Sequence, residues 1–248
     1  FLGLSHIEYF SFNGTDDYFE IPAAISPDIS NSDFTIEFWI KFTPNLNTWN
    51  SILYLGSYSI SLLLSIYNDN SNNKTLYVQF NHPAANHSVF NVTSLSTTDF
   101  NHMAITYQQG LDNNTAIKLY IDGIVVSQNL ALGTGNPQNG NIATGKITIG
   151  TRGEHNDSYF KGELKLLRIW NDIRTEEEIN NAILLGKPNL NNYSTSITNN
   201  LLLFTPLNSM DSNIYTSGTV TNITINPNFL GTIDTDSYEF DGIDDYFI

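Results

Sequence analysis

Short runs in which apolar and polar residues alternate, separated by Gly, Asn, Asp and Pro, are the dominant pattern of the chain. The clearest is FTIEFWIKFT at residues 34–43. Successive side chains of a β-strand point to opposite faces, so this run predicts a strand with one face in a core and the other toward solvent. Its core face would consist of Phe34, Ile36, Phe38, Ile40 and Phe42. Similar runs recur at intervals of about ten residues, which predicts an all-β fold, a two-sheet antiparallel β-sandwich or jelly roll.

Two turns in the sequence predict how some of these strands are connected. The pair Asp122-Gly123 supplies the positive φ angles that a tight hairpin requires. Gly14 lies between the alternating runs at residues 7–13 and 17–22, which predicts a second hairpin.

One helix is predicted, near residues 175–185. Thr175 is a favourable N-cap, and Glu178 stands three positions later, where it completes a capping box. The apolar residues Ile179, Ala182 and Ile183 form a stripe at helical spacing, which predicts that the helix packs against the edge of the sandwich.

Charge and composition exclude several classes of function. The net charge is −15 with only ten Lys plus Arg, whereas nucleic acids and anionic membrane surfaces are bound by clustered basic side chains. The longest apolar stretch, Ser61–Tyr67, is too short to span a bilayer, so no membrane insertion is expected. The chain contains no Cys, which excludes disulfides, thiolate catalysis and Cys-ligated zinc.

Several motifs in a fixed order resemble the laminin-G-like branch of the concanavalin-A-like lectin superfamily. Between Ile7 and Leu185 they are SFNGTDDYFEIP, FTIEFWIKF, FNHMAITYQ, KLYIDGIVV and YFKGELKLLRIWNDIRTEEEI. The resemblance implies a jelly roll of two stacked antiparallel sheets, often in tandem, in secreted adhesins, toxins and multidomain enzymes. It therefore implies an extracellular or cell-surface protein whose partner is a glycan or a cell-surface protein. Lys165 and Leu166 stand where many members carry an acidic pair, so a cation held by that pair is not expected.

A repeated phrase bears on the domain organisation. FNGTDDYF at residues 12–19 recurs as FDGIDDYF at residues 240–247. In the family that the chain resembles, an apolar strand like LLLFTPL opens a module ahead of this phrase, and only the second copy has such an opening. This predicts a chain cut out of phase with tandem modules. The predicted parts are a sandwich body at residues 1–187, a polar linker at 188–200, and a segment at 201–248 that opens a second repeat or completes a neighbouring module.

No catalytic constellation is found in the sequence. Hydrolases of the laminarinase type need two carboxylates on one strand, and no E-x-D-x-x-E arrangement is present. The five His residues show no H-E-x-x-H pattern, and the acidic residues Glu176–Glu178 are explained by a helix start. The chain is therefore not expected to be an enzyme.

Acidic turns suggest structural calcium. Hard oxygen ligands are offered by Asp16, Asp17, Asp241, Asp244 and Asp245, and loop carbonyls could complete the coordination. The alternative is an Asp-rich turn that only caps a hairpin through side-chain hydrogen bonds.

Sugars stack on exposed aromatic rings, and the candidate rings are Trp39, Trp49 and Tyr67. For each of them the alternative is ordinary packing. Eight N-x-S/T sequons permit glycosylation, in a chain so rich in Asn, Ser and Thr that chance explains most of them. They are at Asn13, Asn73, Asn86, Asn91, Asn113, Asn156, Asn192 and Asn222.

Three functions remain open on this evidence. The first is a non-catalytic extracellular module that binds carbohydrate or mediates adhesion, taken from a tandem-repeat surface protein. The second is a structural subunit of an extracellular filament, assembled with neighbouring copies of itself by strand exchange of the C-terminal segment. The third and weakest is an accessory domain of a glycoside hydrolase, which would rest on the superfamily alone.

Overall fold

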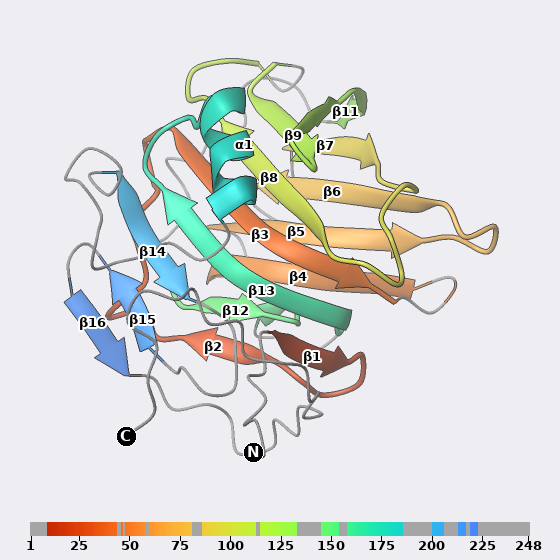
Figure 1. The fold of residues 1–248 in the computed structure, drawn as a ribbon, viewed down its shortest axis with the longest axis horizontal. Coiled ribbons are helices and arrows are strands. Elements are labelled where there is room, and N and C mark those ends of the chain that lie inside the picture. The colour runs from red at the N-terminus through yellow and green to blue at the C-terminus, as the bar shows by residue number, and fades with distance from the viewer. Residues whose placement is uncertain are drawn as a thin grey trace, which may run out of the picture.

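Two antiparallel β-sheets stacked face to face form the fold (Figure 1). The structure is a computed structural model that describes residues 9–43, 46, 48–57, 60–80, 86–112, 115–132, 145–153, 158–185, 200–205, 213–216 and 219–222. These residues form sixteen strands and one helix, so the predicted fold class, a two-sheet antiparallel sandwich with one short helix, is confirmed.

The first sheet, sheet A, contains nine of the described strands in the order β10-β9-β8-β3-β13-β14-β15-β16, with β1 also paired to β13. Its strands are β1 (Phe10–Asn13), β3 (Phe34–Phe42), β8 (Asn101–Tyr107), β9 (Ile117–Ile121), β10 (Ile124–Val126), β13 (Lys161–Trp170), β14 (Leu201–Thr205), β15 (Asn213–Thr216) and β16 (Thr219–Asn222).

The second sheet, sheet B, contains seven strands in the order β11-β7-β6-β5-β4-β12-β2. Its strands are β2 (Phe19–Ile21), β4 (Thr48–Ser57), β5 (Ile60–Asn68), β6 (Lys74–Phe80), β7 (Asn86–Asn91), β11 (Gln128–Leu132) and β12 (Ile147–Ile149).

The hydrophobic core lies between the two sheets. All five apolar residues predicted for the core face of β3 are at most 1% exposed and belong to the main core cluster. The opposite face of β3 does not simply meet solvent, because Thr35 and Glu37 are also buried. The segment after β13 covers Thr35, whose hydroxyl donates to the carbonyl of Asp172 (2.8 Å) and accepts from the backbone N–H of Arg174 (2.9 Å).

One of the two predicted hairpins is confirmed and the other is wrong. Strands β9 and β10 pair across Asp122 and Gly123, whose φ angles are 50° and 78°. Strands β1 and β2, on either side of Gly14, do not pair with each other, because β1 pairs with β13 in sheet A and β2 with β12 in sheet B. The turn at Gly14 is therefore a corner that passes the chain from one sheet to the other.

The helix α1 (Glu176–Leu185) begins with the predicted capping box. The backbone N–H of Glu178 donates to the Thr175 hydroxyl (3.3 Å), and the Glu178 carboxylate accepts from the backbone N–H of Thr175 (2.8 Å). Ile179 packs against Ala104 and Tyr120, so the helix lies on the outward face of sheet A rather than at the sandwich edge. Within the described residues, no helix combines the length and the apolarity needed to cross a membrane.

Strands β1 and β14 share one edge of β13. Strand β1 pairs with residues 161–164 of β13, and β14 pairs with residues 167–170. Between them lies Leu166, with a φ of 55°, at a shift in the register of β13 against β3 on the other side. Residues 201–205 thus extend the sheet of their own chain, as Figure 1 shows. The second copy of the repeated phrase lies outside the described residues, and the domain boundaries stay a prediction.

Candidate ligand-binding face of sheet B

The outward face of sheet B gathers aromatic and hydroxyl side chains in neighbouring rows, because directly paired strand residues share a face. Trp49 of β4 pairs with Tyr67 of β5. In the next row, Ser51 of β4 pairs with Ser65 of β5, which in turn pairs with Tyr77 of β6. The ring centroid of Trp49 lies 5.0 Å from that of Tyr67 and 4.9 Å from that of Tyr77, and Trp49 is 42% exposed. The three rings form an aromatic cluster that is open to solvent at Trp49.

Two hollows border this cluster, and Trp49 and Ser158 line both. The first has a volume of about 100 Å³ and is also lined by Ser51, Leu63, Ser65, Gln79 and Arg152. The second, of about 320 Å³, is also lined by Gly14, Thr48, Asn50, Tyr159 and Lys161. The face therefore offers one exposed aromatic ring, Trp49, beside two recesses of mixed polarity that differ in most of their lining residues.

Backbone contacts between distant segments form the wall of the first hollow. The N–H of Ser51 donates to the carbonyl of Ser158 (2.7 Å), and Ser158 has a φ of 58°, a left-handed conformation that is unusual for a residue other than Gly. Gly153 has a φ of 50°, and a Cβ at this position would lie 2.5 Å from the Tyr54 ring. Only glycine fits this close approach, and the neighbouring Arg152 lines the hollow.

Two buried hydroxyls line the same hollow. Ser51 and Ser65 are only 1% and 2% exposed, and neither hydroxyl has a hydrogen-bond partner among the described residues. A buried hydroxyl without a partner costs about 1–3 kcal/mol, so such groups are normally satisfied by protein, water or ligand. The hollow is therefore prepared for a molecule that forms hydrogen bonds.

Two of the three aromatic residues predicted to bind sugar meet at this face, Trp49 and Tyr67. Trp39 lies on sheet A instead, where its ring meets the His102 ring edge-on at 5.3 Å and lies 5.8 Å from the ammonium of Lys165. The assignment of all three to a ligand stays a prediction.

Sequence reasoning did not identify the residues that line the first hollow apart from Trp49. A signal for some of them was present, because Leu63 and Ser65 occupy alternate positions of SLLLSIY, and Gln79 alternates with apolar residues in KTLYVQF. The contributions of Arg152 and Ser158 depend on long-range approach and have no such signal.

Asp16 and Asp17 brace the turn at Gly14. The Asp17 carboxylate accepts from the backbone N–H of Asn13 (2.8 Å), and the Asp16 carboxylate accepts from the Asn13 side-chain amide (2.8 Å). Burial raises the pKa of Asp17, although the hydrogen bond from Asn13 opposes the shift and the charge of Asp16 adds to it. No three His, Asp or Glu side chains of the described residues form a metal-binding group. Asp241, Asp244 and Asp245 lie outside that part of the chain, and calcium stays a prediction.

The predicted glycosylation sites differ in how their side chains are used. The side-chain amides of Asn13 and Asn73 donate to the carboxylates of Asp16 and Asp69, both at 2.8 Å. Asn91 is exposed at the end of β7, and its amide oxygen accepts from the backbone N–H of Thr93 (2.9 Å). Of the remaining sites, Asn86 and Asn222 lie in β7 and β16, and Asn113, Asn156 and Asn192 lie outside the described residues.

A buried ionic cluster joins β3, β8 and β13 on the outward face of sheet A. The Glu37 carboxylate accepts from Trp170 Nε1 (3.1 Å) and Arg168 Nη1 (3.2 Å), and it lies 3.3 Å from His102 Nε2. Burial acts to raise the pKa of Glu37, but the adjacent His102 side chain and the charge of Arg168 outweigh it and hold the pKa below its usual range.

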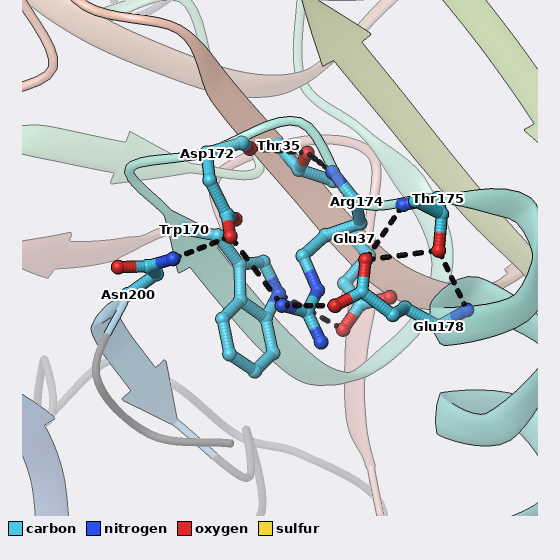
Figure 2. Close-up of polar contacts among 8 residues, drawn as sticks. All are labelled: Thr35, Glu37, Trp170, Asp172, Arg174, Thr175, Glu178 and Asn200. Carbon is cyan, nitrogen blue, oxygen red and sulfur yellow. Dashed lines mark hydrogen bonds and ion pairs between the residues drawn. The ribbon is translucent and has the colours of Figure 1, made fainter. Parts of the chain in front are cut away.

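The same cluster continues toward the helix. Figure 2 shows the Arg174 guanidinium between the carboxylates of Asp172 (3.5 Å) and Glu178 (3.0 Å), and Asn200 donating to Asp172 (2.6 Å). Arg174 also lies over the Trp170 ring, 4.2 Å from its centroid. These contacts connect β13, α1 and the start of β14. The cluster therefore has a structural role, which is to hold these three elements together.

Comparison with known proteins identifies relatives of this fold. A laminin G-type family model, described as the concanavalin A-like lectin/glucanases superfamily, matches residues 13–180. A search of curated proteins finds no match.

Several solved structures share the fold at low sequence identity. A candidate carbohydrate-binding protein from Bacteroides ovatus is 18% identical, with a TM-score of 0.55 over 86% of this chain and 56% of that chain. The CBM40 module of the Ruminococcus gnavus IT-sialidase, bound to α2,3-sialyllactose, is 14% identical, with a TM-score of 0.53 over 71% and 96%. A SAP-like pentraxin from Limulus polyphemus is 16% identical, with a TM-score of 0.51 over 70% and 80%.

Proposed function

Since the chain belongs to the concanavalin A-like lectin/glucanase superfamily, we propose that it is a non-catalytic carbohydrate-binding module of an extracellular or cell-surface protein. The observation that carries this proposal is the exposed Trp49 ring beside the buried Ser51 and Ser65 hydroxyls, which have no hydrogen-bond partner among the described residues. A sugar has apolar C–H faces and a rim of hydroxyl groups. An open aromatic ring next to buried polar groups suits both parts of such a ligand.

The position of the site supports the proposal. Trp49, Ser51 and Ser65 lie on adjacent paired strands in the middle of sheet B, so their relative positions are set by strand pairing rather than by a loop. A preformed site costs little ordering entropy on binding. The Ruminococcus gnavus module of similar fold was solved with a bound sialylated sugar, which supports a glycan as the class of ligand.

The test is a glycan array followed by calorimetric titration of the best binder. Trp49→Ala should weaken binding at least about tenfold, because a central aromatic anchor carries a large share of the binding energy. Ser65→Ala should weaken it less, since it removes one hydroxyl and leaves the ring. The matched control is Leu184→Ala, which truncates an 82%-exposed apolar side chain on α1, far from this face, and should not change affinity. The proposal fails if no glycan binds saturably, or if Trp49→Ala binds as tightly as the unchanged protein.

One observation favours a second candidate, a structural subunit that assembles by strand exchange. Strand β14 occupies only the half of the β13 edge that β1 does not, and residues 186–199 separate it from α1. A β14 strand from a neighbouring copy could occupy the same half edge with the same pairing, which is the usual route to a domain-swapped assembly.

A further inference from the structure

The first hollow beside Trp49 is too small for a sugar ring. Its volume is about 100 Å³, whereas an engineered cavity that takes up benzene has about 150 Å³. The second hollow, of about 320 Å³, reaches the range of roughly 300–1,000 Å³ that is typical of pockets for whole small molecules. A sugar unit therefore fits the second hollow or the face of Trp49, and only a substituent of a unit fits the first hollow.

The lining of the first hollow combines hydrogen-bonding groups with an apolar surface. Ser51 and Ser65 are at most 2% exposed, and their hydroxyls have no hydrogen-bond partner among the described residues. The buried Leu63 contributes an apolar side chain, and the half-buried Gln79 contributes an amide. Strand pairing sets these positions, because Ser51 pairs with Ser65, and Leu63 pairs with Gln79. A substituent that suits this lining has both a hydrogen-bonding part and an apolar part.

We infer that the first hollow binds the acetamido group of an N-acetylated sugar whose ring stacks on Trp49. The inference rests on the proposed function and names the class of its ligand. A carbonyl oxygen has two lone pairs, so the acetamido oxygen accepts hydrogen bonds from both Ser51 and Ser65. The methyl group contacts Leu63, and the acetamido N–H donates to the side-chain oxygen of Gln79. A hydroxyl group in the same place would leave Leu63 against a polar group or water.

A unit stacked on Trp49 has room for the rest of its chain. Trp49 is 42% exposed and lines both hollows. A sugar whose acetamido group enters the first hollow therefore extends its next unit into the second hollow, which has the volume to receive it. The inferred ligand is an N-acetylated oligosaccharide.

The experiment compares sugars that differ only at this group, by calorimetric titration of the full chain. Chitotriose and cellotriose have the same β-linked glucose backbone and differ in carrying an acetamido group or a hydroxyl beside each anomeric carbon. N-acetyllactosamine and lactose make the same comparison with a galactose unit attached. If another acetylated glycan is the best binder on the array, it is compared with its own counterpart that lacks the acetamido group. In at least one pair the acetylated sugar should bind about tenfold more tightly, because a site built to hydrogen-bond a group rejects an analogue without it.

Two Ser positions assign the preference to the first hollow. Ser51→Ala and Ser65→Ala each remove one donor, and each should reduce the preference for the acetylated sugar about fivefold, the usual effect of one hydrogen bond. Ser65→Val fills part of the hollow with a branched side chain and should abolish the preference.

Ser61→Ala is the matched control. Ser61 lies on the same strand and face as Ser65, is buried, and its hydroxyl also has no hydrogen-bond partner among the described residues. It is not among the described residues that line either hollow, so its loss should leave the preference within about twofold. Each of the three Ala variants removes a buried hydroxyl that lacks a partner. Each should therefore melt no lower than the unchanged protein, which shows that it is folded.

The outcomes separate this inference from the proposed function. If acetylated and non-acetylated sugars bind equally and Trp49→Ala weakens both, the face binds sugar and the inference alone is overturned. An array whose binders all lack an acetamido group also overturns it. So does a preference that survives in Ser65→Val, or one that falls equally in Ser61→Ala and Ser65→Ala. If no glycan on the array binds saturably, the proposed function fails as well.

Discussion

Glu37 is an ionised carboxylate in a nearly water-free place, and its contribution to stability depends on pH. Its pKa in the folded protein lies below the ordinary value of 4.5. Because the pKa is lower in the folded state, the folded protein binds fewer protons than the unfolded chain at pH values between the two pKa values. The ionised group therefore stabilises the fold fully above about pH 4.5, and this contribution is lost as pH falls through the folded pKa.

Glu37→Gln tests this dependence. At neutral pH the variant should be less stable by about 3–5 kcal/mol, since it leaves the Arg168 charge buried without its carboxylate. The difference from the unchanged protein should shrink as pH falls below about 4.5, because the unfolded chain then binds a proton at Glu37 that the folded protein does not yet bind. Urea unfolding at a series of pH values measures it. A difference that stays constant over this range would show that Glu37 is not the source of the acid sensitivity.

Individual residues also show where sequence reasoning ended. The aromatic residues Trp49 and Tyr67 could be proposed for a ligand because they stand near strand ends in the sequence. The other residues of the site could not be proposed from the sequence, because Ser158 and Ser51, which are hydrogen-bonded, lie more than a hundred positions apart in the chain. The alternation in the sequence placed Thr35 on the solvent-facing side of its strand. That expectation was wrong because Asp172, which is distant in the chain, covers Thr35.

At the scale of elements, local signals predicted the helix and the tight turn well. The capping box of α1 and the Asp-Gly turn between β9 and β10 both act within four residues, so the sequence contains all the participants. The failed hairpin at Gly14 has a different cause. A turn between paired strands and a corner between two sheets use the same residues, and only the distant partners β12 and β13 distinguish them.

The capping box gives a prediction about one element. Thr175→Ala removes the hydroxyl that accepts from the Glu178 N–H and should cost about 1 kcal/mol. Thr97→Ala, at an exposed position ahead of β8, is the matched control and should cost less than about 0.5 kcal/mol. Urea unfolding of both variants makes the comparison. Equal costs would mean that the cap does not stabilise α1 measurably.

At the scale of the whole molecule, structural calcium is open to a direct test. If calcium binds only the folded protein, chelator should lower the melting temperature by several degrees and added calcium should restore it, by mass action. Asp17→Ala should abolish the calcium effect if Asp17 is a ligand. A melting temperature that does not move across millimolar calcium would exclude the site, and a calcium effect that survives in Asp17→Ala would exclude that ligand.

Deleting residues 200–248 tests the role of the C-terminal segment in assembly. The deletion removes Leu201 and Phe204, which pack against Leu166 and Trp170, and it exposes half of the β13 edge. An unpaired edge with bare apolar side chains favours pairing with another chain. The truncated protein should keep most of its β-signal in circular dichroism, and it should either lose native assembly or self-associate non-specifically. Light scattering distinguishes these outcomes, and a truncated protein that assembles as the full chain does would contradict the exchange model.

The shared edge of β13 also sets an order on biosynthesis. Strand β1 is synthesised before β13, so it can pair with residues 161–164 as soon as these are made. Residues 167–170 have no partner on this edge until β14 (Leu201–Thr205) has been synthesised. At the usual elongation rate of about 5–20 residues per second, the gap between Trp170 and Thr205 lasts roughly 2–7 s. During that interval sheet B is complete among the described strands, and sheet A lacks β14, β15 and β16. A ribosome that pauses between these two points lengthens the time in which a neighbouring nascent chain can supply the missing strand first.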